Sequence, residues 1–265
     1  MRFIGSPRDG NPRHLARRGS SHGRSRARDA DAMILDACDA ADVKLWAVAG
    51  DVTDAHGDDV AAWAARIGTD LAQAAGAKRP ELDRVGLNGR AALQFATGED
   101  MRATPGPDYS GTDQLIVSVV CQCGDSSAIR DVICGSNAAA RNFILGRPAA
   151  NQAWAFRKPS YHYAVSAKGA NPPPEVLGVA YSTTGAIATG QALYADAALL
   201  ASSSTSGAID EGNFGLSATL FVGMRYTASN YIGGPIAGIY MAAGSTATAT
   251  ALRQVQAAQR YAWGI

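Results

Sequence analysis

The 265-residue sequence has little charge, few aromatic rings and few cysteines. Charged residues make up 18% of it and aromatic residues 7%, and there are four cysteines and four histidines. Such a chain is not a disulfide-dense miniprotein, and a hydrophobic content of 47% excludes a fully disordered one. No run approaches about 18 consecutive apolar residues, so we expect no membrane insertion. The length allows one large domain with a sizeable core.

The motifs of several common enzyme classes are also missing. The chain has no G-x-S-x-G nucleophile turn, no G-x-x-x-x-G-K-S/T phosphate loop, no G-x-G-x-x-G and no H-E-x-x-H. His162 is the only histidine after His56. It lies between two tyrosines in a strand-like run, and we interpret it as a surface or groove histidine without a catalytic role.

The net charge of +1 conceals an uneven distribution. Residues 1–30 hold eight arginines and two aspartates, whereas residues 31–60 hold eight aspartates and one lysine. No apolar segment follows the first arginines, which predicts no secretory leader and folding in a cytoplasm. The low apolar content predicts a flexible basic arm over residues 1–30, either solvated or docked on a partner. We expect docking on a protein assembly rather than on nucleic acid, through Arg13, Arg17, Arg18, Arg24, Arg26 and Arg28.

From residue 44 onward, short apolar or alternating runs are separated by Gly, Pro, Asn, Asp and Ser. Their spacing predicts an all-β, antiparallel sandwich or barrel over residues 44–265. Residues 31–43 are expected to form a short helical linker. A helical pattern covers residues 247–262, with Ser245 or Thr246 as its N-terminal cap and Gly264 after its end. The predicted strands are 44–48, 60–65, 91–96, 114–122, 130–134, 141–146, 152–157, 161–166, 176–182, 191–195, 216–222 and 235–241.

The cysteines allow three interpretations. Cys121 and Cys123 are two apart in a strand-like run and therefore share a face. We favour buried, reduced thiols that act as small hydrophobic side chains. A metal site with Cys134 as a third ligand and a Cys123–Cys134 disulfide are the alternatives.

Two segments, residues 45–101 and 232–265, resemble the opening and the end of a known superfamily. The second segment runs from a Gly-rich strand through a short helix to Trp-Gly, and the features of the first are Leu45-Trp46, the acidic loop Asp51 to Asp59, Trp63, Arg79-Pro80, Asn88-Gly89 and Leu93 to Phe95. They are similar to the LamG-like branch of the concanavalin A-like lectin/glucanase superfamily, which is common in phage structural proteins. The resemblance implies a β-sandwich jelly roll in which the two ends of the domain pair. The resemblance rests on the whole set of these features, and no single residue identifies the superfamily.

The resemblance also frames the chemistry. Glucanases of this superfamily carry a Glu-x-Asp-x-Glu strand, which places two carboxylates close together for retaining hydrolysis. This sequence has no such run, so we expect a protein that is not an enzyme and needs no cofactor. Lectins of the superfamily often hold Ca²⁺, and clustered acids make Asp51, Asp54 and Asp58 the candidate ligands. A solvated turn is the other interpretation of that loop.

The aromatic residues divide into two groups. Trp46, Trp63, Phe95 and Trp263 lie in the superfamily-like segments and are expected in the core. The stretch from residue 154 to 163 combines aromatic and basic residues, and sugars stack on aromatic rings while their hydroxyls take hydrogen bonds. The predicted carbohydrate site therefore consists of Trp154, Arg157, Lys158, Tyr161 and Tyr163.

These observations predict a non-enzymatic structural protein of a phage or phage-like particle, as a head spike, fibre or decoration. Its partners would be capsid or tail proteins and the surface polysaccharide of the host. We expect display on the virion surface after cytoplasmic synthesis, as a homo-oligomer or in many copies. A bacterial lectin module and a glycan hydrolase or lyase are the alternatives.

Overall fold

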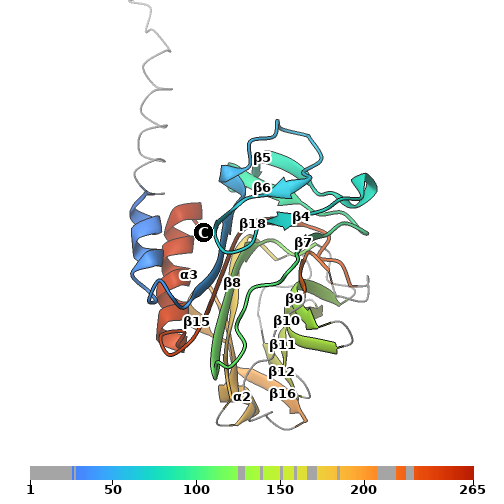
Figure 1. Cartoon of the computed structure of the whole chain (residues 1–265). Coiled ribbons are helices and arrows are strands. Elements are labelled where there is room, and N and C mark those ends of the chain that lie inside the picture. Colours follow the sequence, from blue (N-terminus) through green and yellow to red (C-terminus); the bar gives the residue numbers. More distant parts are fainter. Residues whose placement is uncertain are drawn as a thin grey trace, which may run out of the picture.

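The computed structural model describes residues 26, 28–124, 129–137, 140–149, 152–157, 160–165, 172–183, 186–207, 219–224 and 230–265. Over these ranges the chain forms two packed antiparallel sheets, with helices on one side (Figure 1). The predicted all-β sandwich with a C-terminal helix is confirmed. Arg13, Arg17, Arg18, Arg24 and Lys158, named above as site residues, lie outside the described residues.

The first sheet lies beneath the helices. Two of its strands lie off the main strand order: β6 (Arg90–Gln94) pairs with β18 (Pro235–Ala243), and β5 (Glu81–Leu87) pairs with β6. The order of its other strands is β15 (Ala198–Leu199), β14 (Gln191–Ala195), β13 (Glu175–Ser182), β8 (Gln114–Cys121), β18 (Pro235–Ala243), β1 (Val43–Val48) and β3 (Ala65–Ile67).

The second sheet packs against the inner face of the first. Its strand order is β16 (Ser202–Ser206), β12 (Ser160–Val165), β11 (Gln152–Arg157), β10 (Ala140–Ala149), β9 (Arg130–Asn137), β17 (Thr219–Val222), β7 (Met101–Ala103), β4 (Leu71–Ala72) and β2 (Ala62–Trp63).

Strand alternation explains how β8 is buried on both faces. Val117 and Val119 belong to the core between the sheets, whereas Ile116 and Val120 pack in the cluster beneath the helices. Such a strand has no polar face, and its sequence reads as a nearly continuous apolar run. The pairing of the two chain ends is also as expected, because β1 pairs with β18 in the middle of this sheet.

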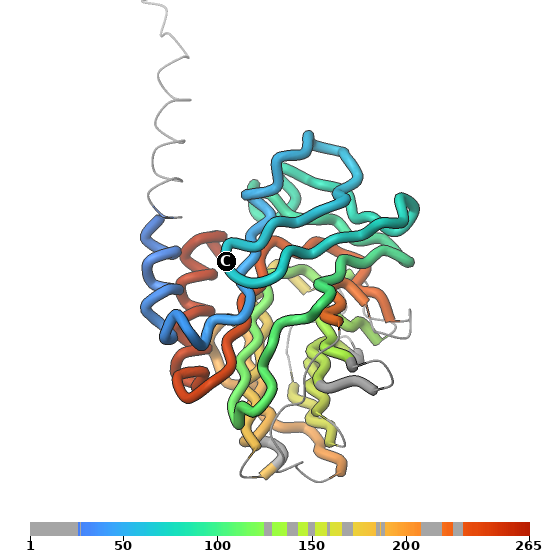
Figure 2. Tube along the Cα trace, in the orientation of Figure 1, coloured from blue at the N-terminus to red at the C-terminus, as the bar shows by residue number. Residues whose placement is uncertain are grey.

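Two helical segments cover the outer face of the first sheet. One is α3 (Ala249–Trp263), and the other spans residues 28–35 (Figure 2). They run antiparallel, because the Arg26 guanidinium lies 5.6 Å from the Tyr261 ring while the Cys38 thiol donates to the Thr246 carbonyl. The remaining helical turns are η1 (Ala49–Asp51), η2 (Gly76–Lys78) and α2 (Ile187–Gly190). No helix among the described residues is long and apolar enough to cross a membrane.

The aromatic residues and cysteines expected in the core lie there. Trp46, Trp63, Phe95 and Trp263 are all buried, as expected. All four cysteines are free and buried. The neighbouring Cys123 thiol and burial raise the pKa of Cys121 well above its usual value, so this thiol stays protonated. The predicted surface or groove position of His162 was wrong, because the residue is only 1% exposed and its Nδ1 lies 2.6 Å from the carbonyl oxygen of Gln191.

Candidate functional site

The second sheet carries aromatic side chains on its outer face. In β11, Ala153 and Ala155 belong to the core between the sheets, so alternation turns Trp154 and Phe156 to the opposite face. There they form a separate cluster with Cys134 and Ile144, and aromatic residues of the adjacent β12 pack against it. We call this cluster, with Tyr161, Tyr163 and Phe221, the aromatic face.

The rings of the aromatic face are stacked. The ring of Trp154 is nearly parallel to the rings of both Tyr161 and Tyr163, with centroids 6.0 Å apart in both pairs and interplanar angles of 8° and 17°. These separations are typical of favourable offset stacking. Trp154 is only 3% exposed, whereas both tyrosines are half-buried. The tyrosines are therefore the accessible part, and the indole of Trp154 supports them from within.

Hydroxyl groups lie beside the tyrosines on the edge strand. Every residue of β16, with the sequence SSSTS, is exposed. Tyr163 pairs with Ser204 and Tyr161 with Ser206 across the antiparallel ladder, and directly opposite residues project from the same face. The sequence analysis missed this strand, because a run of small polar residues has no apolar periodicity. The only signal in the sequence was an uninterrupted run of five serine and threonine residues.

The other end of the aromatic face carries a paired cation. Phe221 of β17 is opposite Arg102 of β7, and the guanidinium lies 5.1 Å from the centre of the phenyl ring. Arg102 Nε donates to the buried carboxylate of Asp100 at 2.5 Å. A charge held in this way, beside an aromatic ring, is rigid and partly neutralised.

The structure brings together three of the five residues predicted for carbohydrate binding and separates a fourth. Trp154, Tyr161 and Tyr163 are neighbours on the aromatic face. Arg157 is buried, and its guanidinium donates to the Ser182 carbonyl oxygen, in the first sheet, at 3.0 Å. The physical reason is parity, since residues 154 and 157 are an odd number apart on one strand and project from opposite faces.

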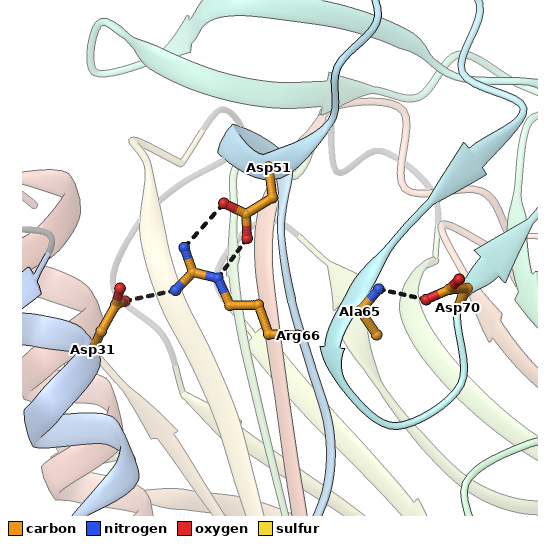
Figure 3. Close-up of polar contacts among 5 residues, drawn as sticks. All are labelled: Asp31, Asp51, Ala65, Arg66 and Asp70. Atoms are coloured by element: carbon orange, nitrogen blue, oxygen red, sulfur yellow. Dashed lines mark hydrogen bonds and ion pairs between the residues drawn. The ribbon is translucent and has the colours of Figure 1, made fainter.

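The predicted calcium ligands are directed to separate partners. Asp51 is paired with Arg66, and its Oδ1 accepts from Nη2 at 3.0 Å (Figure 3). Asp58 accepts from the backbone N–H of Ala55 at 2.9 Å. The main-chain oxygen of Asp54 accepts from Arg84. No three His, Cys, Asp or Glu side chains within the described ranges form a group that could hold a metal ion. Calcium binding in this loop thus stays a prediction.

Comparison with known proteins shows similarity at the level of fold. No protein-family model matches the sequence, and no curated protein matches it. Among solved structures, the sialidase of Trypanosoma rangeli is similar with a TM-score of 0.56 and 9% identity, over 91% of this chain and 39% of that one. Its complex with sialic acid gives a TM-score of 0.50 over the same shares. The chain thus spans well under half the length of these sialidases.

A smaller structure is more weakly similar. The CBM40 domain of the Ruminococcus gnavus IT-sialidase, bound to α2,3-sialyllactose, has a TM-score of 0.41 and 11% identity, over 57% of this chain and 88% of that one. At such low identities the two sialidase comparisons establish a shared β-sandwich architecture, and the function has to be argued from the residues of this chain.

Proposed function

We propose that this protein binds carbohydrate through the aromatic face, without chemical conversion of the sugar. The observation that carries the proposal is the stacking of the Trp154 ring with two half-buried tyrosines. The C–H faces of a sugar ring stack on such aromatic surfaces. The exposed hydroxyls of Ser204 and Ser206, opposite those tyrosines, are placed to exchange hydrogen bonds with sugar hydroxyls.

The proposal extends to the biological setting. We infer a member of the concanavalin A-like superfamily that serves as a structural component of a phage or phage-like particle, displayed on its surface to bind host polysaccharide. The support is the resemblance of residues 45–101 and 232–265 to such proteins, together with the sandwich fold. Capsid or tail proteins would hold the basic arm. Weak single sites gain avidity of about 10² to 10⁴ when several copies act together.

The direct test is binding of purified protein to an array of bacterial polysaccharides, compared with the variants Tyr161→Ala and Tyr163→Ala. Stacking of this kind contributes about 0.5–1.5 kcal/mol per aromatic pair, so each variant should bind roughly 2- to 12-fold more weakly. Tyr261→Ala is the matched control, because Tyr261 is an exposed tyrosine on α3, on the other side of the molecule. Circular dichroism would verify that each variant is folded.

The outcomes separate the candidate functions. Binding that falls in Tyr161→Ala and Tyr163→Ala but not in Tyr261→Ala supports the aromatic face. Equal binding by all four proteins would place the sugar elsewhere. Shortening of the polysaccharide chains, measured by gel filtration after incubation, would replace the binding role with that of a hydrolase or lyase. Binding without incorporation into any particle would favour a free-standing lectin.

A further inference from the structure

A cavity lies on the side of the sandwich opposite the aromatic face, between the helices and the first sheet. It has a volume of about 310 Å³, at the lower end of the range for small-molecule pockets. The helix of residues 28–35 contributes Ile34, and the sheet contributes Trp46 and Val48. The end of α3 contributes Trp263. The walls are therefore largely apolar, with two indole rings among them.

The two acidic residues of this cavity share one cation. Asp31 and Asp51 both line it, and both are bound to Arg66 (Figure 3). The Arg66 guanidinium lies 4.7 Å from the centre of the Trp46 ring. Burial lowers the pKa of Arg66, but the hydrogen bond to Asp51 and the charge of Asp31 outweigh burial and leave that pKa raised. This triad therefore offers no free cation to a ligand and carries about one net negative charge.

Hydrogen-bond donors remain on the other walls. Arg90 lines the cavity, and its guanidinium has no ion pair or hydrogen bond with any described residue. The buried indole N–H of Trp263 likewise has no hydrogen-bond partner in the described part of the chain. Gln259 accepts from the Ser118 hydroxyl through Oε1, at 2.6 Å, and so keeps its amide N–H groups for another acceptor. Three of the residues that line this apolar cavity thus carry donor groups that are free to bind a ligand.

We propose that this cavity binds a small organic carboxylate, with its apolar body against Ile34, Val48 and Trp263 and its carboxylate facing Arg90. A carboxylate accepts several hydrogen bonds, and its negative charge would pair with the positive charge of the Arg90 guanidinium. Burial of the apolar body supplies the rest of the affinity. This site is separate from the aromatic face and does not depend on the proposed carbohydrate function.

The experiment is calorimetric titration with three acid and amide pairs: phenylacetate and phenylacetamide, indole-3-acetate and indole-3-acetamide, hexanoate and hexanamide. Within each pair the shape is nearly constant, and the amide lacks the negative charge and one of the two acceptor oxygens. At least one acid should bind saturably and about tenfold more tightly than its amide, because hydrogen bonds between charged groups are roughly twice as strong as neutral ones. Arg90→Gln should remove that preference and leave amide binding unchanged.

Four further variants fix the location. Arg253→Gln removes an exposed arginine of α3 outside the cavity and should bind the acid as the unaltered protein does. Ala262→Leu fills the cavity and should abolish binding; if it does not fold, Ala91→Leu fills it from the half-buried β6 wall. Tyr163→Ala should not affect the acid. No saturable binding by any pair, equal affinity of acid and amide, or unchanged binding by Arg90→Gln would each overturn the proposal.

Discussion

Tyr181 shows how one buried hydroxyl links the two sheets. It projects from β13 of the first sheet and donates to the Ile144 carbonyl oxygen, in the second sheet, at 2.7 Å. Burial is the main reason that the pKa of Tyr181 lies well above its ordinary value of 10.0. In the unfolded chain the phenol ionises near pH 10, whereas in the folded protein it stays neutral. The contribution of Tyr181 to stability is therefore intact below about pH 10 and falls as the pH rises further.

We predict that Tyr181→Phe has opposite effects on two measurements. At pH 7 the free energy of unfolding should fall by about 1 kcal/mol, because the buried Ile144 carbonyl oxygen loses the hydrogen bond from the Tyr181 hydroxyl. Between pH 10 and 12 the stability of the variant should decline less steeply, by up to about 1.4 kcal/mol per pH unit. Urea denaturation at several pH values measures both. An unchanged alkaline slope would contradict the proposed origin of the pKa shift.

At the scale of single elements, the start of α3 shows why local sequence alone did not identify its cap. Residues 245–250 offer four hydroxyl side chains, and the cap was predicted at Ser245 or Thr246. The structure instead caps the helix with Thr248, whose Oγ1 accepts from the N–H of Ala251 at 3.2 Å. Thr246 is engaged elsewhere, because its N–H and its hydroxyl both donate to Asp42, 204 residues away along the chain.

We predict that Thr248→Ala lowers the free energy of unfolding by about 1 kcal/mol, within the 0.5–2 kcal/mol typical of lost N-caps. Thr250→Ala is the matched control, since Thr250 is exposed in the first turn, and it should change stability by less than about 0.5 kcal/mol. Ser245→Ala should be equally mild. Thermal unfolding of the three variants ranks them. A larger loss for Ser245→Ala than for Thr248→Ala would restore the cap predicted from sequence.

Some strands were predicted from the sequence more accurately than others. The apolar runs at 114–122 and 235–241 correspond closely to β8 and β18, because β18 is buried along its whole length and β8 from its second residue on. The strand Glu81–Leu87 was missed, because it is half-exposed and its polar positions break the alternation. On the aromatic face, proximity in sequence predicted Trp154 with both tyrosines. Ser204 and Ser206 join them only through strand pairing over some 40 residues, which local patterns do not encode.

At the scale of the whole molecule, a buried ion pair crosses between the sheets. Arg147 of β10 and Glu175 of β13 are fully buried and form two hydrogen bonds, of 2.7 and 2.6 Å. Both charges have lost their hydration, so their mutual attraction mainly offsets the cost of burying them. Such a pair therefore fixes how the two sheets face each other more than it adds net stability.

We predict that Glu175→Gln destabilises the protein by about 3–5 kcal/mol, because it leaves the Arg147 charge buried without its counter-charge. The double variant Arg147→Met with Glu175→Met should recover most of this loss, since it removes both charges and keeps similar volumes. Chemical denaturation of both proteins measures the difference. If the double variant were as unstable as Glu175→Gln, the pair would contribute stability of its own.

The antiparallel helices have a practical consequence for handling the molecule. Arg26 lies against Tyr261 on the helix side, and the aromatic face points away on the far side of the second sheet. A biosensor chip that captures the protein through a tag placed before residue 26 would leave the tyrosines, on the opposite side, open to the flowing sample. Capture through β16 would shield those same rings. The choice of anchoring point alone should therefore decide whether an immobilised layer responds to sugar.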